Sequence, residues 1–233
     1  MKAEAVIDTI AKFFNDLIGA WVPGAVLVFG LALVHVGPVQ LQSIFELGDT
    51  TSAAFTFAGI LFALGHVLLA LHEQILKEPL TRLGLLKAFD EAEAKRRQPY
   101  EWFAELVKAQ QAGGGAKDWG YNDLCSIALS VSSEAGAIGR RFMFISLLCN
   151  GVGMALTIIA LDFAVCSVLW PKLLFSYDYA APWSVQVALM LCLAWALFKR
   201  GEVFFSRAKI TPFAVAAAEL KVKKDANAGN ETA

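Results

Sequence analysis

The stretch that decides the fold is Phe57 to Leu76, FAGILFALGHVLLALHEQIL, which is apolar over most of its length and contains His66. A helix of about 20 such residues rises about 30 Å, which matches the hydrocarbon thickness of a bilayer. The rest of the chain agrees, because 57% of its 233 residues are hydrophobic and only 18% are charged. This composition predicts a membrane protein and not a soluble domain.

Four windows are long and apolar enough to cross a membrane, at about residues 17–36, 53–72, 142–162 and 183–198. The third is ambiguous because its apolar run continues past Asp162, and the fourth is somewhat short. We therefore predict an all-α polytopic membrane protein with four transmembrane helices. Its expected parts are an N-terminal amphipathic segment with a first hairpin (1–75), a helical insert (76–141), a second hairpin (142–199) and a tail (200–233).

The distribution of lysine and arginine predicts the orientation. Residues 37–52 contain none and residues 171–182 contain only Lys172, whereas residues 76–141 contain ten and residues 199–233 contain seven. Because cytoplasmic loops carry the excess of cations, we expect both termini and the insert to lie in the cytoplasm.

The insert is expected to fold as helices, because its ten cations are matched by nine acidic residues. One helix is predicted to start at Pro79 and to run through LTRLGLLKAFDEAEAKRR to Arg97, and a second to run from Pro99 to the glycines at 113–115. A third is predicted to run from Tyr121 into the third span without a break. Apolar residues of the tail, among them Phe213, are expected to dock on these helices or on the membrane surface.

Polar residues at one depth form a predicted inner layer. Counting from the cytoplasmic ends places His66, Asn150 and the pair Pro23-Gly24 at one level, about 9 Å inside the membrane. Pro23 leaves the Gly19 carbonyl without its helical donor, so that His66 or Asn150 is a candidate to supply one. Two interpretations remain open: an ion or proton path, or a neutral His66 that sets helix register.

A second polar level is predicted near the outer surface, where His35 and Asp162 fall. Asp162 is either hydrated at the interface or held within the hydrocarbon with His35 as its partner. At the cytoplasmic end of the second span, His72 and Glu73 are interpreted as a solvated helix end. Because His35 and His66 lie at opposite depths, and no carboxylate or cysteine cluster is evident, we predict no metal, no cofactor and no catalytic residues. The four cysteines are interpreted as free thiols.

Three segments carry a resemblance: DLIGAWVPG (16–24), ALGHVLLALHEQIL (63–76) and LLCNGVGMAL (147–156) preceded by Arg140-Arg141. They resemble bacterial four-span inner-membrane proteins of uncharacterised function, which have a Pro-Gly in the first span, a Gly-His in the second and a cytoplasmic helical insert. The resemblance covers roughly residues 1–160. It implies the same topology in the inner membrane of a bacterial cell and carries over no catalytic residue.

Three hypotheses for function follow. The first is a non-enzymatic membrane protein that self-associates, or binds a membrane or cytoplasmic partner, and forms or gates an ion-permeable pore. Four small-xxx-small spacings favour helix packing within one chain or between copies, at Ala20-Gly24, Ala54-Ala58, Gly59-Ala63 and Gly151-Ala155. The second is a small transporter or transport subunit that uses His66 and Asp162 for protons. The third is a lipid enzyme acting through His72 and Glu73, although no catalytic motif is present. The expected partners are lipids and other proteins, and not nucleic acid.

Overall fold

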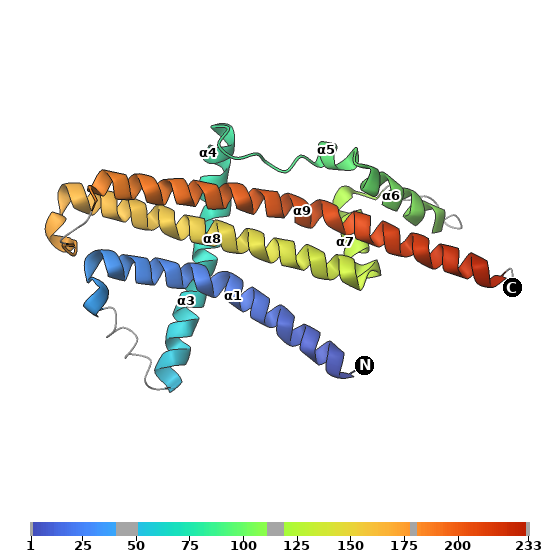
Figure 1. The fold of residues 1–233 in the computed structure, drawn as a ribbon, viewed down its shortest axis with the longest axis horizontal. Coiled ribbons are helices and arrows are strands. Elements are labelled where there is room, and N and C mark those ends of the chain that lie inside the picture. The colour runs from blue at the N-terminus through green and yellow to red at the C-terminus, as the bar shows by residue number, and fades with distance from the viewer. Residues whose placement is uncertain (1, 41–50, 111–118, 178–180, 232–233) are drawn as a thin grey trace. The chain divides into compact units, whose positions relative to one another are not determined.

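The computed structural model describes the backbone of residues 2–40, 51–110, 119–177 and 181–231, without the side chains of residues 2–17, 51, 110 and 223–231. Within these residues the chain is built from helices and their connections (Figure 1). In chain order they are α1 (Lys2–His35), α3 (Thr51–Leu71), the π-helical turn η1 (His72–Leu76), α4 (Lys77–Arg82), α5 (Glu91–Lys95), α6 (Gln98–Gln110), α7 (Tyr121–Val131), α8 (Ser133–Leu169), the 3₁₀ turn η2 (Pro171–Leu173) and α9 (Trp183–Glu231).

The chain divides into two compact units. The first unit comprises Met1–Lys87 and Phe144–Gly201, and the second comprises Ala88–Met143 and Glu202–Ala233. Helices α8 and α9 each contribute residues to both units, because their long runs pass the unit boundaries at residues 143 and 201. The first unit holds most of the apolar sequence, and the second holds α5, α6 and α7.

Among the residues that the structure describes, three helical segments are long and apolar enough to cross a membrane: Ile18–His35, Ser52–Arg82 and Ser133–Leu169. The second and third extend beyond the predicted windows, so the apolar run after Asp162 belongs to one longer helix. The fourth predicted span, 183–198, is the beginning of α9 and is not among these three segments. It is shorter than the about 20 residues that a span needs. The structure thus shows a helical protein with three candidate crossings, which indicates a multi-pass membrane protein.

Glycines bring α1 and α3 together in the first unit. A Cβ on Gly24 would lie 1.9 Å from the Leu61 carbonyl oxygen, and a Cβ on Gly65 would lie 1.6 Å from the Ala20 carbonyl oxygen. Ala20 and Leu61 are themselves buried. Because neither position has room for a side chain, the backbones touch directly, as in small-residue packing of membrane helices. Packing within the chain therefore uses the Ala20-Gly24 pair.

Glycines of α8 receive larger side chains from the neighbouring helices of the first unit. Gly151 lies against the ring of Pro23, and Gly153 lies against the ring of Phe198 on α9, where a Cβ would come within 2.5 Å and 2.7 Å of those rings. Pro23 and Phe198 are buried. The core of the first unit is thus formed where bulky residues of α1 and α9 fill the space that the glycines of α8 leave.

An aromatic cluster forms the core of the second unit. Phe213 of α9 packs on Tyr100 and Phe103 of α6 and on Tyr121 of α7, with ring centroids 5.2 Å, 5.6 Å and 5.4 Å away. Phe103 and Phe213 are almost completely buried. Burying an aromatic side chain of this size stabilises a fold by about 2 to 3 kcal/mol. This contact confirms that apolar residues of the tail dock on helices of the insert.

The predicted helix from Pro79 through Arg97 is wrong. Pro79 lies in α4, which continues the second span through η1 and ends at Arg82. Gly84 then takes φ +72°, a conformation that glycine adopts without strain and that stops the helix. A new short helix, α5, begins only after Asp90, whose carboxylate accepts hydrogen bonds from the Ala92 and Glu93 amides. The helix predicted from Pro99 is present as α6, but its predicted end at 113–115 lies outside the described residues.

The predicted continuous helix from Tyr121 into the third span is also wrong. It breaks at Ser132, which has extended backbone angles, φ −119° and ψ 118°. The Ser132 hydroxyl is buried and accepts a hydrogen bond from the Ala135 amide at 3.1 Å. Ser132 therefore caps the N-terminus of α8, and such a side-chain bond competes with continuation of the preceding helix.

Candidate functional site

His35 and Asp162 meet near the ends of two membrane-length helices of the first unit. His35 Nε2 lies 2.7 Å from Asp162 Oδ2, and His35 Nδ1 lies 3.0 Å from the Leu173 carbonyl oxygen, to which it donates. The two side chains are 32% and 33% exposed. The structure therefore shows the pairing of His35 with Asp162 that the sequence suggested.

A tight turn at the end of α1 positions His35. The amides of Val36 and Gly37 both donate to the Ala32 carbonyl, and Gly37 takes φ +82°. A Cβ on Gly37 would lie 2.5 Å from the Phe175 ring, so only glycine fits there. The Phe175 amide in turn donates to the Val34 carbonyl at 2.9 Å. These contacts tie the segment after η2 to the end of α1 and bring the Leu173 carbonyl to His35.

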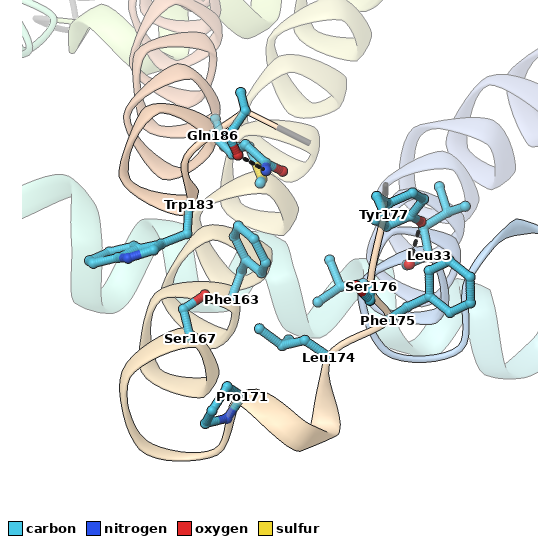
Figure 2. Close-up of a pocket in the computed structure, with 13 residues that line it drawn as sticks. Leu33, Phe163, Ser167, Pro171, Leu174, Phe175, Ser176, Tyr177, Trp183 and Gln186 are labelled. Atoms are coloured by element: carbon cyan, nitrogen blue, oxygen red, sulfur yellow. Dashed lines mark hydrogen bonds between the residues drawn. The ribbon is translucent and has the colours of Figure 1, made fainter. Parts of the chain in front are cut away.

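Chain neighbours of His35, Asp162 and Leu173 line a cavity of about 900 Å³ in the first unit. Figure 2 shows Phe163 and Ser167 of α8 on its wall, with Trp183 and Gln186 of α9 on one side and the segment through Leu174 on another. Tyr177 donates to the Leu33 carbonyl at 2.8 Å, and Gln186 donates to the Ala181 carbonyl at 2.7 Å. The lining is largely apolar with a few polar groups, as in sites for small apolar molecules.

Cys166 joins His35 and Asp162, which the sequence analysis missed. The Cys166 thiol lies one helical turn after Asp162, and its Sγ is 3.9 Å from Asp162 Oδ1. One ligand atom from each of the three residues falls within 4.8 Å of the others. The expectation that no carboxylate or cysteine cluster exists is therefore wrong. The signal was the i, i+4 spacing of Asp162 and Cys166, which places both on one face of a helix.

The predicted inner layer is assembled without His66. Pro23 and Gly24 are buried at the contacts of α1 with α8 and α3, and Asn150 is 3% exposed. Asn150 faces α9, because a Cβ on Gly201 would lie 2.1 Å from its Oδ1. His66, however, is exposed, and its ring packs on Phe62 with a centroid distance of 4.5 Å. The structure thus brings neither Asn150 nor Asp162 to His66, because His66 faces outward from the first unit.

His72 is the buried histidine of this unit, and its interpretation as a solvated helix end is wrong. Its side chain is 0% exposed and stacks on Phe198 of α9, with ring centroids 4.9 Å apart. Neither ring nitrogen has a hydrogen-bond partner, and the closest charged atom, Glu73 Oε1, is 3.7 Å from Nδ1. The reason is that the helical segment continues to Arg82, so His72 lies within the span.

Glu73 lies beside His72 but points to the surface. Its carboxylate is half exposed and pairs with Lys77 at 3.1 Å, one turn further along the chain. An i, i+4 ion pair of this kind contributes about 0.5 kcal/mol or less. Of the two side chains, only that of Glu73 therefore reaches the surface, because His72 is 0% exposed.

Comparison with protein-family models, with curated proteins and with solved structures finds no match. The described residues offer two features for a function: a His–Asp–Cys cluster beside a cavity at the ends of α1 and α8, and an exposed histidine on α3.

Proposed function

We propose that the chain is a non-enzymatic membrane protein that self-associates through α3 and forms an ion-permeable assembly. The observation that carries this proposal is the position of His66. It is exposed in a candidate span that runs from Ser52 to Arg82, 14 residues from one end and 16 from the other. A polar side chain that faces lipid at this depth costs several kcal/mol, and a neighbouring copy would remove that cost.

His66 belongs to a continuous exposed face of small and polar residues. The spacing of this face alternates between four and three residues along α3 and into η1, in the order Ser52, Thr56, Gly59, Ala63, His66, Ala70 and Glu73, all exposed. A 3.5-residue repeat is the pattern by which helices pack side by side, and small residues permit close approach in a membrane. We name these seven residues the α3 stripe.

The stripe differs from the small-residue pairs used inside the chain. Ala20-Gly24 packs against α3, whereas a Cβ on Gly59 would meet no atom within 4 Å. The Gly59-Ala63 pair is therefore open to a second copy. In a ring of copies, hydroxyl, imidazole and carboxylate groups of the stripe would face one another and provide polar contacts for a hydrated ion.

In this assembly each chain would cross the membrane four times, and the beginning of α9 would be the fourth crossing. In that arrangement both termini and the helical insert lie in the cytoplasm, on the side that the cation excess of residues 76–141 and 199–233 favours. The fourth crossing is short, but Trp195 stands near its inner end with Lys199 4.7 Å from the ring, as expected for residues at a membrane interface.

Cross-linking in vesicles tests the self-association. In a chain whose four cysteines are replaced by serine, Ala63→Cys should form a disulfide-linked dimer on mild oxidation. The matched control retains only Cys192, which is exposed on α9 and away from the stripe. Equal yields of dimer from the two chains would show that collisions, and not the stripe, bring the copies together.

Ion flux from dye-loaded vesicles tests the assembly. Vesicles with the wild-type chain should leak cations faster than empty vesicles, and His66→Leu should reduce the flux several-fold. The control Val67→Leu changes an exposed neighbour outside the stripe and should leave the flux unchanged. Wild-type vesicles that are no leakier than empty ones would overturn the pore.

A further inference from the structure

We propose that His35, Asp162 and Cys166 form a zinc site at the contact of α1 and α8. This site is independent of the α3 stripe and of the proposed pore. Its three donors are an imidazole, a carboxylate and a thiol, whose ligand atoms all lie within 4.8 Å of one another. They come from the last turn of α1 and from two successive turns of α8.

The separations of the donors match a tetrahedral ion. With bonds of about 2.0 Å to nitrogen and oxygen and about 2.3 Å to sulfur, neighbouring ligands lie about 3.3 to 3.6 Å apart. The structure has 2.7 Å between His35 Nε2 and Asp162 Oδ2, and 3.9 Å between Asp162 Oδ1 and Cys166 Sγ. These two distances use different oxygens of Asp162, one shorter and one longer than required, and the third pair of donors lies within 4.8 Å. Side-chain shifts of about 1 Å would therefore admit the ion.

The surroundings of His35 favour a metal at Nε2. Its Nδ1–H donates to the Leu173 carbonyl at 3.0 Å, and this is the outer-shell bond that orients most metal-binding histidines. With the Nδ1 proton held there, Nε2 presents a lone pair toward the Asp162 carboxylate, which is itself an acceptor. Either a second proton or a cation must lie between them, and a zinc ion satisfies both acceptors.

Charge and access also fit zinc. A divalent ion with one carboxylate, one thiolate and one neutral imidazole has no net charge, which limits its cost at the edge of a membrane. His35 and Asp162 are one-third exposed, so an ion can reach them from water. Thiolate and imidazole donors disfavour Mg²⁺ and Ca²⁺, which prefer oxygen ligands. Three protein ligands leave a fourth position for water.

Cobalt absorbance tests the site directly, because Co²⁺ substitutes for zinc and a thiolate ligand produces a near-ultraviolet charge-transfer band. The purified full-length chain in detergent should show this band with one Co²⁺ per chain, and Zn²⁺ should abolish it. The Cys166→Ser chain should lose the band, and His35→Ala and Asp162→Asn should weaken Zn²⁺ binding at least tenfold.

Cys149→Ser and Cys192→Ser are the matched controls, because they remove thiols elsewhere in the same unit and should leave the band unchanged. Absence of the band in the wild-type chain, or its persistence in Cys166→Ser, would overturn the proposal. Gel filtration and circular dichroism identify any variant that fails to fold.

Protection of the Cys166 thiol from chemical labelling tests the site without a spectrum. In a chain that retains only Cys166, Zn²⁺ should slow labelling by a small maleimide at least tenfold, and His35→Ala should remove that protection. In a chain that retains only Cys192, Zn²⁺ should have no effect. Because Cys166 is buried, its labelling without Zn²⁺ follows brief opening of the site. A measurable labelling rate that Zn²⁺ leaves unchanged would contradict a thiolate–metal bond.

Discussion

Gly65 of α3 touches the backbone of Ala20 on α1, because a Cβ at position 65 would lie 1.6 Å from the Ala20 carbonyl oxygen. The same helix carries Gly59, where a Cβ would meet no atom within 4 Å. Two glycines six residues apart on one span therefore have opposite roles. One is required for the contact between α1 and α3, and the other lies on the exposed α3 stripe.

This difference predicts opposite effects of the same substitution. Gly65→Ala forces the two helices apart and should destabilise the fold by about 3 kcal/mol. Gly59→Ala removes the entropic cost of a helical glycine and should leave the stability of a single chain unchanged or raise it by about 0.5 kcal/mol. Unfolding in mixed micelles, followed by far-ultraviolet circular dichroism, measures both. Equal losses would contradict the α1–α3 contact.

The environment of His72 inside the first unit predicts that an apolar ring can replace the imidazole. Its ring stacks on Phe198, and neither nitrogen has a hydrogen-bond partner. Burying such polar atoms costs about 1 to 3 kcal/mol. His72→Phe should therefore keep or raise the melting temperature in detergent, whereas His72→Ala leaves a cavity and should cost about 3 kcal/mol. If His72→Phe were as harmful as His72→Ala, the ring nitrogens would have a role that the stacking does not explain.

The cap at Ser132 predicts that removing its hydroxyl lowers the stability of the fold at the start of α8. Its hydroxyl accepts from the Ala135 amide, and an N-cap of this kind contributes about 1 kcal/mol. Ser132→Ala should lower stability by that amount and increase hydrogen exchange at the Ala135 amide. Ser130→Ala is the matched control, because the exposed Ser130 hydroxyl bonds only to the Ile127 carbonyl of its own helix. A similar change in both variants would argue against a cap at Ser132.

Tyr121 predicts a loss of stability in alkali. Its hydroxyl donates to the Lys209 carbonyl at 3.0 Å, and burial, helped by Cys125 and Glu91, raises the pKa of Tyr121 above its ordinary value of about 10. The folded chain therefore holds this proton at pH values where the unfolded chain releases it. The free energy of unfolding should fall as the pH rises above about 10.

The Tyr121→Phe variant distinguishes the titration of Tyr121 from that of the other groups in the chain. The variant should lose about 1 kcal/mol at neutral pH with the hydrogen bond, and should then lose less stability than wild type above pH 10 or so. Burial also raises the pKa of the Cys125 thiol, so a smaller alkaline decline should remain in both chains. Denaturant unfolding at a series of pH values measures the difference. Parallel curves would contradict the titration of Tyr121.

The sequence by itself determined which three regions form long apolar helices and where α6 begins. These features are local, because apolar length and a proline at a helix start act on nearby residues alone. Docking of Phe213 was also predictable in outline, since an apolar tail beside amphipathic helices has few other places to bury its side chains.

Only the tertiary structure decided which side of each helix faces a partner. Hydropathy places His66 and His72 on the same span, but rotation about the helix axis depends on the neighbours, and close packing against α1 at Gly65 leaves His66 outside while His72 meets Phe198. The joining of His35 to Asp162 across 127 positions likewise depends on two helix ends meeting. The depth of a residue in the membrane follows from counting along one helix. The proximity of two residues on different helices depends on how those helices pack. For that reason the His35–Asp162–Cys166 cluster is visible only in the folded chain.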